Sequence, residues 1–99
     1  MTENGTRQEF DHPDPDDGEV YDDLRIRNLR LNLTQLARAL KDGVPVKGYF
    51  HWSFMDNLEW HHGFRPRFGY VYINYSNLQR IPKLSAKWMK EVIRNGRVM

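Results

Sequence analysis

The sequence contains no cysteine, no long apolar run and no block of like charges. The absence of cysteine excludes a disulfide framework and a thiolate metal site, although it leaves the cellular compartment open. No stretch approaches the ~18 apolar residues of a membrane-spanning helix, and the first residues show neither the basic region nor the apolar core of a signal peptide. We therefore expect no membrane partner.

Charged residues are plentiful but dispersed. The 99 residues include 15 Lys and Arg and 13 Asp and Glu, for a formal net charge of +2. A nucleic-acid-binding protein usually presents a basic stripe or run, which this arrangement lacks. A small basic nucleic-acid-binding module is therefore the least favoured interpretation, and we expect no nucleic-acid partner.

The histidines do not form a recognisable metal site. His61 and His62 are adjacent, and together with His51 they lack the cysteine or well-spaced acid that would complete a zinc site. The acids from Asp14 to Asp17 lack the alternating spacing of a calcium-binding loop. We expect neither a metal ion nor a cofactor.

Apolar and aromatic residues are frequent enough to form a folded core. Hydrophobic residues make up 39% of the chain and aromatic residues 13%, which argues against disorder over most of its length. Ninety-nine residues suit one small domain with a modest core. We therefore treat residues 1–99 as a single unit.

A long amphipathic helix is the clearest predicted element. It follows residues 11–19, "DHPDPDDGE", whose prolines, glycine and acids predict an exposed loop. Asp22 and Asp23 favour a helix start, and Gly43 favours its end, so we predict a helix over residues 20–43. Its apolar residues recur at steps of three and four, the helical period: Ile26, Leu29, Leu33, Leu36, Ala37 and Leu40.

Residues 44–53 predict a β-strand. The run "VKGYFHWSF" is dense in Val, Tyr, Phe and Trp, and we expect it to be buried on both faces. A long helix that leads into such a strand is the second half of a βαβ unit. The first strand of that unit should end at Glu3, with residues 1–10 forming its tip and the following turn. These residues alone would then not complete a parallel sheet.

The remaining residues predict a loop, a β-rich run and a short helix. Residues 54–84 include an aromatic loop and the run "FGYVYINY", which is rich in strand-forming residues. Over residues 85–96 we predict a helix with Ser85 as its N-cap and Gly96 as its end. Its expected apolar face consists of Trp88, Met89, Val92 and Ile93.

The segment "WSFMDNLEWHHGFRPRF" concentrates aromatic rings and carboxylates directly after the predicted strand. In α/β folds, functional sites assemble at the carboxyl ends of strands and in the loops that follow. Flat aromatic faces suit the apolar face of a sugar ring, and carboxylates accept hydrogen bonds from its hydroxyl groups. An aromatic core with a solvated acid is the alternative, because aromatic residues also dominate protein cores.

Several motifs in this order resemble glycoside hydrolase family 1, the β-glucosidase family. They are "TENG", "VYDDLRIRNL", "DGVPVKGYFHWSFMDNLEW", "HHGFRPRFGYVYINY" and "RIPKLSAKW", and they span nearly the whole chain. The resemblance implies an α/β fold that is the C-terminal quarter of a TIM (β/α)8 barrel, from the end of strand 7 through helix 8. It does not imply a complete barrel.

The resemblance also implies a catalytic residue. The glutamate of "TENG" is the nucleophile of a retaining double displacement in this family, and here it is Glu3. Such a carboxylate forms a glycosyl-enzyme ester, which water then hydrolyses with the help of a second carboxyl group about 5 Å away. In the family that acid/base belongs to an "NEP" motif, which these 99 residues lack. The resemblance therefore implies a partner, the N-terminal part of a barrel, and an isolated chain without activity.

Four further residues match sugar-binding positions of the family. By resemblance, Trp52 forms the stacking floor under the sugar, Glu59 accepts hydrogen bonds from its O4 and O6 hydroxyls, Trp60 contacts the same part of the ring, and Phe68 closes the pocket. The family also has a cis peptide bond after the tryptophan at position 52. The alternative role for all four side chains is core packing.

The implied substrate is a neutral terminal β-D-glycoside, because the Glu59 carboxylate would repel a phosphorylated sugar. The sugar itself, whether glucose, galactose or fucose, stays open. A non-catalytic carbohydrate-binding or structural piece is the alternative function.

Overall fold

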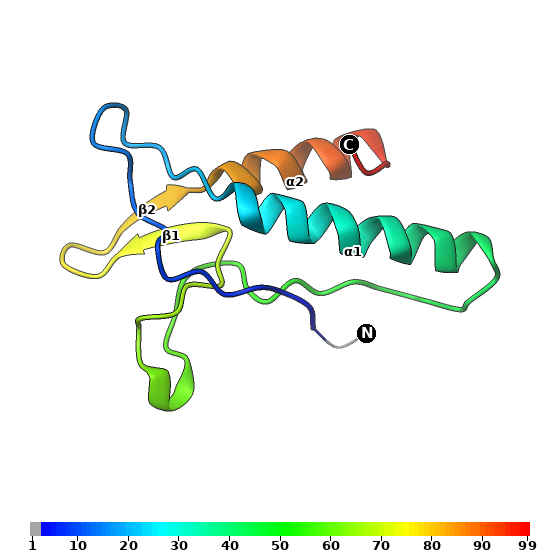
Figure 1. Cartoon of the computed structure of the whole chain (residues 1–99), viewed down its shortest axis with the longest axis horizontal. Coiled ribbons are helices and arrows are strands. Elements are labelled where there is room, and N and C mark those ends of the chain that lie inside the picture. Colours follow the sequence, from blue (N-terminus) through cyan, green and yellow to red (C-terminus); the bar gives the residue numbers. More distant parts are fainter. Residues whose placement is uncertain (1–2) are drawn as a thin grey trace.

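The computed structural model describes residues 3–99. Along the chain lie helix α1 (Asp23–Lys41), a single 3-10 turn (Trp60–His62), strands β1 (Val71–Asn74) and β2 (Gln79–Pro82), and helix α2 (Leu84–Asn95). Figure 1 shows α1 and α2 side by side and running in the same direction, with the β1–β2 hairpin beyond their N-terminal ends. Met1 and Thr2, where the predicted strand tip begins, lie outside the described residues.

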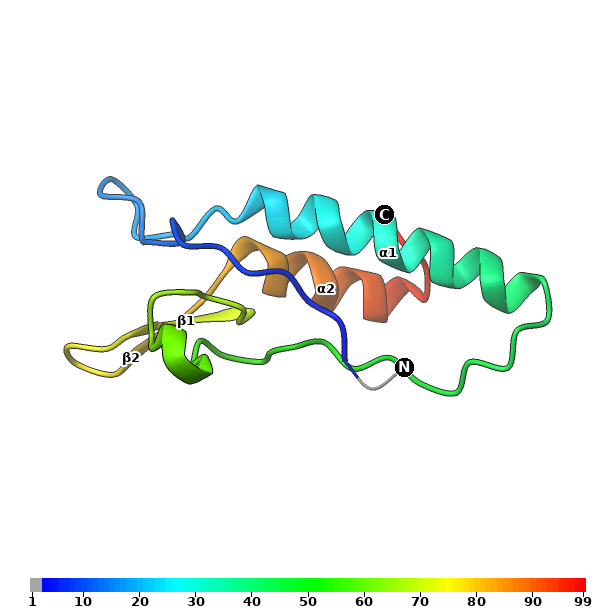
Figure 2. The ribbon, with the colours of Figure 1, turned by 60° about the horizontal axis from the view of Figure 1, so that its bottom comes forward.

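Helix α1 is shorter at both ends than the predicted span 20–43. Asp22 occupies the N-cap position and Asp23 lies in the first turn, where a negative charge interacts favourably with the helix dipole. Ile26, Leu29 and Leu33 of the predicted apolar face are buried, whereas Leu40 is 48% exposed. Figure 2 shows the reason, because α1 extends past the end of α2 and its last turns have no facing helix among residues 3–99.

Helix α2 begins one residue earlier than predicted. Lys83 occupies the N-cap position, and the prediction that Ser85 caps the helix is wrong. The Ser85 hydroxyl and backbone N–H both donate to the Asp22 carboxylate, at 2.5 and 2.8 Å. This contact ties the first turn of α2 to the start of α1. Ile93, predicted on the apolar face, is 74% exposed.

Residues 44–53 are extended but do not form a strand, which corrects the prediction. They pair with residues 3–10, here called the N-terminal arm, through one parallel bridge between Asn4 and His51. The predicted burial on both faces is also wrong, since Phe50 is 63% exposed. A buried parallel strand needs neighbours along both edges and helices on both faces. Within residues 3–99 this segment has a single short neighbour.

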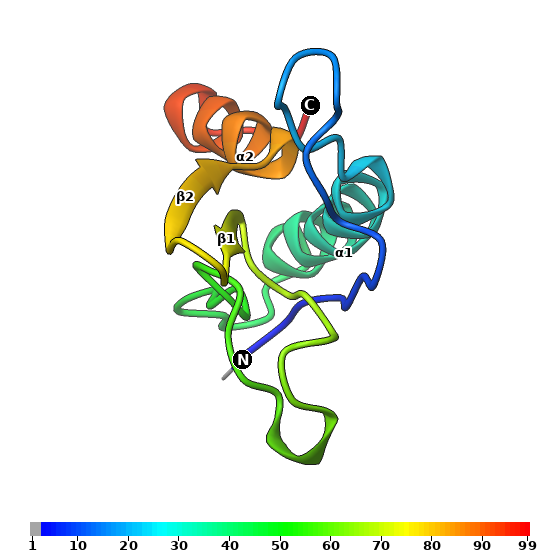
Figure 3. The ribbon, with the colours of Figure 1, turned by 90° about the vertical axis from the view of Figure 1, so that its left-hand side faces the viewer.

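Residues 52–70, here called the site loop, fold against the start of the hairpin. Strands β1 and β2 pair antiparallel, with Val71 opposite Pro82 and Asn74 opposite Gln79. The two ends of the loop lie side by side and are joined by a hydrogen bond from the Ser53 N–H to the carbonyl of Phe68, at 3.0 Å. Figure 3 shows the middle of the loop projecting away from both helices.

The apolar core is small and contains a chain of buried charges. Its buried hydrophobic residues are Val20, Ile26, Leu29, Leu33 and Ile73. Beside them six charged side chains alternate in sign, here called the ion-pair chain: Asp22, Arg25, Asp11, Lys83, Asp56 and Arg67. Three carboxylates balance three cations, which is the condition for burying charge at acceptable cost.

The molecule is flat, with principal extents of 46 × 32 × 18 Å. Many large apolar side chains are exposed, among them Val44, Phe50 and Phe54. Neither helix in residues 3–99 is long and apolar enough to cross a membrane.

Candidate functional site

The five side chains predicted to form a site meet in one pocket. Its volume is about 440 Å³, and it lies between the N-terminal arm and the site loop. The lining residues are Glu3, Trp52, Asn57, Leu58, Glu59, Trp60 and Phe68. Asn57 and Leu58 were not predicted, although both lie inside the quoted motif "MDNLEW". The pocket combines aromatic faces with two carboxylates, a composition that suits a polar ligand with an apolar face.

Glu3 is placed by the parallel bridge that follows it. Asn4 donates its N–H to the carbonyl of Phe50 at 2.9 Å and accepts the N–H of Trp52 at 2.7 Å. The Asn4 side chain accepts a hydrogen bond from the hydroxyl of Tyr49 at 2.9 Å. These contacts hold the backbone beside Glu3 against the start of the site loop, so that Glu3 and Trp52 border the same space.

Trp52 and Phe68 come from the two ends of the site loop. The peptide bond between Trp52 and Ser53 is cis, as the resemblance predicted. Ser53 pairs on both sides with the returning chain, since its N–H donates to Phe68 and its carbonyl accepts the N–H of Tyr70 at 3.0 Å. Trp52 is 40% exposed, which leaves part of its ring free on the pocket side.

Glu59 and Trp60 lie at the projecting turn of the loop. The N–H of Glu59 donates to the carbonyl of Gly63 at 2.7 Å and closes this turn. Trp60 adopts a φ of 44°, a left-handed conformation that costs a non-glycine residue about 1–3 kcal/mol. Its ring is 85% exposed. A strained backbone that presents an exposed indole at a pocket rim is typical of a binding site.

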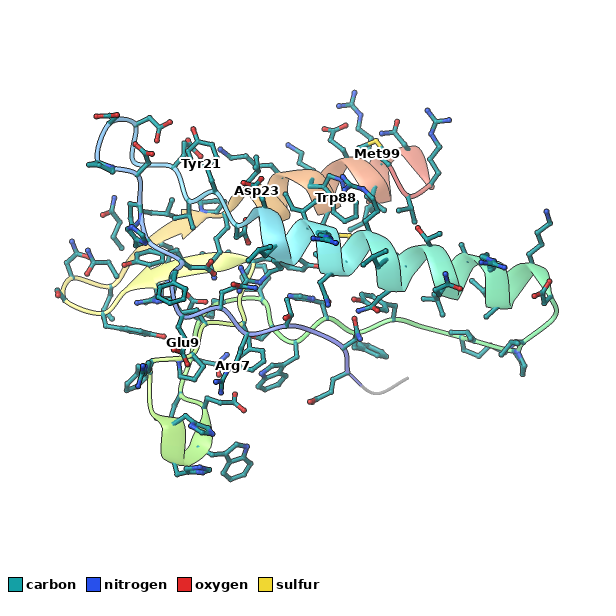
Figure 4. The ribbon with its side chains drawn as sticks, in the orientation of Figure 1. Arg7, Glu9, Tyr21, Asp23, Trp88 and Met99 are labelled. Atoms are coloured by element: carbon teal, nitrogen blue, oxygen red, sulfur yellow. The ribbon has the colours of Figure 1, made fainter. Side chains whose placement is uncertain are left out.

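Glu9 connects the N-terminal arm to the far part of the site loop. Its carboxylate lies 3.3 Å from the guanidinium of Arg7 and 3.4 Å from that of Arg65. Figure 4 shows the side chains of Arg7 and Glu9 on the side of the arm that faces the loop. Both arginines are exposed, at 51% and 80%, and Glu9 is 26% exposed, so these ion pairs contribute little stability.

His51 lies on the opposite side of the extended segment from the neighbouring Trp52 pocket and stacks on Tyr70, with ring centroids 3.8 Å apart. Burial lowers the pKa of His51 to about 4, and the cations Arg25 and Lys83 act in the same direction, while the backbone carbonyl of Phe68 opposes them. His51 is therefore neutral at pH 7 and packs as an aromatic ring.

We expect acid to destabilise the fold through His51. Its pKa is depressed from 6.5 to about 4 on folding, so the unfolded chain binds more protons between these values and the free energy of unfolding decreases as pH falls through this window. With allowance for the exposed part of the ring, His51 should account for about 1 to 2 kcal/mol of this loss.

The measurement is urea unfolding of the chain at pH 7 and at pH 4.5, for the parent and for His51→Phe. The substitution keeps the stacked ring and removes the titrating group, so its free energy of unfolding should change less between the two pH values. An equal pH dependence in both proteins would contradict the role assigned to His51.

Residues 3–99 contain no cluster of three or more His, Asp or Glu side chains that could hold a metal ion. The rings of His61 and His62 are in contact at the projecting turn, with centroids 4.1 Å apart and an interplanar angle of 37°.

Comparison with known proteins places the whole chain in one family. The sequence model of glycosyl hydrolase family 1 matches residues 1–98. The 1,4-beta-D-glucan glucohydrolase of Thermotoga neapolitana is 47% identical over 96 residues, which are 97% of this chain and 21% of that protein. The 6-phospho-beta-galactosidase of Leptotrichia buccalis is 46% identical over 77 residues, 78% of this chain and 16% of that protein.

The solved structures agree with the sequence comparison. Beta-glucosidase from Thermotoga maritima in complex with deoxynojirimycin superposes with a TM-score of 0.95 and 42% identity, covering 100% of this chain and 22% of that chain. The chain thus spans about a fifth of the length of the relatives it matches. Those relatives are TIM barrels, and the fold described above corresponds to part of such a barrel.

Proposed function

This chain belongs to glycosyl hydrolase family 1, and from that premise we propose that it supplies the nucleophile and the sugar-binding side chains of a retaining β-glycosidase. The observation that carries the proposal is the meeting of Glu3, Trp52, Glu59, Trp60 and Phe68 in one pocket. These residues come from two segments separated by helix α1, so their meeting is a property of the fold.

Glu3 is proposed as the nucleophile. Its carboxylate attacks the anomeric carbon of a β-glycoside, the bond from that carbon to the aglycone oxygen breaks, and a glycosyl ester forms on Glu3. The leaving oxygen takes a proton from an acid/base carboxyl group. Water deprotonated by the same group then attacks the ester, which releases the sugar with its β configuration and frees Glu3.

The acid/base is proposed to come from another part of a barrel. The sequence contains no Asn-Glu-Pro motif, and Glu59 is assigned to the sugar hydroxyls by resemblance. We therefore propose that these 99 residues form the C-terminal segment of a barrel, from the end of strand 7 through helix 8. By themselves they should hydrolyse nothing, because protonation of the leaving group is missing.

The other four residues are proposed to hold the sugar at the non-reducing end. Trp52 offers a ring face for stacking, and the Glu59 carboxylate accepts hydrogen bonds from two hydroxyl groups, while Trp60 and Phe68 enclose the same end of the sugar. A charge-assisted hydrogen bond to a carboxylate is about twice as strong as a neutral one. Neutral sugars are favoured, because a sugar phosphate would be repelled by Glu59.

The test is a graft. We call grafted enzyme the Thermotoga maritima beta-glucosidase whose matching segment, 22% of its chain, is replaced by these 99 residues. The grafted enzyme should hydrolyse 4-nitrophenyl β-D-glucoside, and it should prefer this substrate to its 6-phosphate. Neither this chain alone nor the Thermotoga maritima protein without its segment should hydrolyse the glucoside. The matched control is the same enzyme rebuilt with its own Thermotoga maritima segment, joined at the same two positions.

Two results would contradict the proposal. One is turnover by the chain alone that disappears when Glu3 is replaced by Gln. The other is an inactive grafted enzyme beside an active control. Binding of glucose by the chain alone, detected by tryptophan fluorescence and accompanied by an inactive graft, would favour the alternative of a non-catalytic carbohydrate-binding piece.

A further inference from the structure

We propose that Asp56 and Lys83 are positioning residues that fix the distance between the two ends of the site loop, and with it the width of the sugar pocket. The proposal rests on the function proposed above and extends it to residues that touch no sugar. Neither side chain lines the pocket. Both are buried, with side-chain exposures of 0%.

Asp56 binds the returning end of the loop on either side of Phe68. One carboxylate oxygen accepts from the guanidinium of Arg67 at 2.7 Å, and the other accepts the backbone N–H of Gly69 at 3.0 Å. Asp56 itself belongs to the outgoing end, between Trp52 and Glu59. A single carboxylate thus holds Phe68 at a set distance from the segment that carries the other binding residues.

Lys83 fixes Asp56 in turn. Its ammonium group donates to Asp56 at 2.8 Å and to Asp11 at 2.7 Å. Asp11 follows the N-terminal arm, and it also accepts from Arg25 of α1 at 2.6 Å. Lys83 lies at the start of α2, which the contact between Ser85 and Asp22 ties to the start of α1. The ammonium group therefore links the site loop to both helices and to the arm that carries Glu3.

Arg67 closes the connection between arm and loop. Its backbone pairs with Gln8 of the arm in both directions, at 2.7 and 2.8 Å, and its carbonyl accepts from Arg25 at 2.7 Å. Its side chain reaches Asp56 and also lies over the ring of Tyr72, 4.2 Å from the centroid. Both halves of the pocket consequently share one set of buried charges.

The hydrogen bonds of Asp56 and Lys83 are directional, which favours a role in positioning the site loop over a role in stabilising the fold. A buried ion pair often adds no net stability over apolar residues of the same volume, because desolvation offsets the attraction. Its hydrogen bonds nevertheless allow one geometry only. Misplacement of binding groups by about 1 Å can cost up to ~10²-fold in activity, so a pocket built on a long loop gains from such a support.

The test uses the grafted enzyme with Asp56→Asn and Lys83→Met combined. Removing one carboxylate and one cation together keeps the net charge of the ion-pair chain at zero. Arg67 loses its partner Asp56, but its guanidinium still donates to the carbonyl of Ile73 at 2.9 Å and its side chain is 14% exposed. The matched control combines Glu19→Gln and Lys87→Met, because this carboxylate–ammonium pair also joins a loop residue to the beginning of α2 but is exposed, at 40% and 52%.

The measurements are the inhibition constant of deoxynojirimycin, which occupies the solved Thermotoga maritima beta-glucosidase, the KM for the nitrophenyl glucoside, and the fraction of active sites titrated by a fluorosugar that traps the glycosyl ester. In the double variant both constants should rise by about tenfold with the titrated fraction unchanged. In the control pair they should change by less than about twofold.

An unchanged inhibition constant in the double variant, with only Tm or the titrated fraction reduced, would overturn the proposal and leave the pair a purely structural role. If the double variant does not fold, Asp56→Glu is judged by the same criterion, because it keeps the charge and changes the spacing by one methylene. Failure of the proposed function is recognised separately, as an unsubstituted grafted enzyme that is inactive.

Discussion

Replacement of Glu3 by Gly in the grafted enzyme is expected to reduce kcat for 4-nitrophenyl β-D-glucoside by about 10⁴-fold or more, since loss of a nucleophile removes the covalent step itself. Sodium azide should restore turnover, because a small anion can enter the space left by the carboxylate. It attacks from the same face as Glu3 did, so the product is the α-glucosyl azide. Its anomeric configuration is read by proton NMR.

The configuration of the azide product separates two roles for Glu3. Loss of an acid/base would leave the glycosyl ester intact, and azide attack on that ester would give the β-glucosyl azide. Glu9→Gly is the matched control in the same arm, because the Glu9 carboxylate pairs with Arg7 and Arg65 outside the pocket. It should retain most of the activity. A β product from the Glu3 variant, or full activity without azide, would rule out Glu3 as nucleophile.

Replacement of Gly69 by Ala is expected to disrupt the site loop. A Cβ atom at this position would lie 2.3 Å from the backbone nitrogen of Asp56 and 2.3 Å from the carbonyl carbon of Met55. Both are main-chain atoms in hydrogen-bonded groups: the Asp56 N–H donates to the carbonyl of Val71, and the Met55 carbonyl accepts from the Ser53 hydroxyl and the Asn57 amide. Neither can move aside without breaking these bonds. We expect a loss of about 3 kcal/mol, at the upper end for overpacking.

Gly48→Ala provides the matched control for this substitution. Within residues 3–99, a Cβ atom there would approach the ring of Phe50 at 3.5 Å, an ordinary contact distance, and, its chain neighbours apart, no other residue within 4 Å. In the grafted enzyme, Gly69→Ala should lower Tm by several degrees and weaken deoxynojirimycin binding, while Gly48→Ala should leave both close to the parent. Equal Tm values for the two variants would contradict this prediction, because they would show that the backbone around position 69 accommodates a Cβ atom without loss of stability.

The sequence predicted well where the signal is local or carried by a motif. The helical period gave α1 to within a few residues, because an apolar stripe can be recognised without knowing its partner. The five candidate site residues came from the family resemblance, and the fold brings all of them to one pocket. Their chemical roles stay predictions until the substitutions are made.

The errors concern interactions between distant parts of the chain. The run 44–53 has strand-like composition, yet pairing and burial depend on neighbours that residues 3–99 do not supply. Ser85 has the residue type of an N-cap, but the carboxylate of Asp22 competes for its hydroxyl. The ion-pair chain was missed entirely, since Lys83 and Asp11 lie 72 positions apart and isolated Asp, Lys and Arg residues carry no periodic pattern.

The ion-pair chain also bears on how such a segment can be exchanged between genes. Each of its six charged groups finds its opposite within residues 11–83 of the same chain. A recombination crossover before Glu3 would therefore carry every one of these ion pairs across intact. Apolar side chains that are exposed within residues 3–99, such as Phe50 at 63%, tolerate new neighbours better than buried charges do. Family members could in this way exchange the five candidate site residues, together with the ion pairs that support them, as one block.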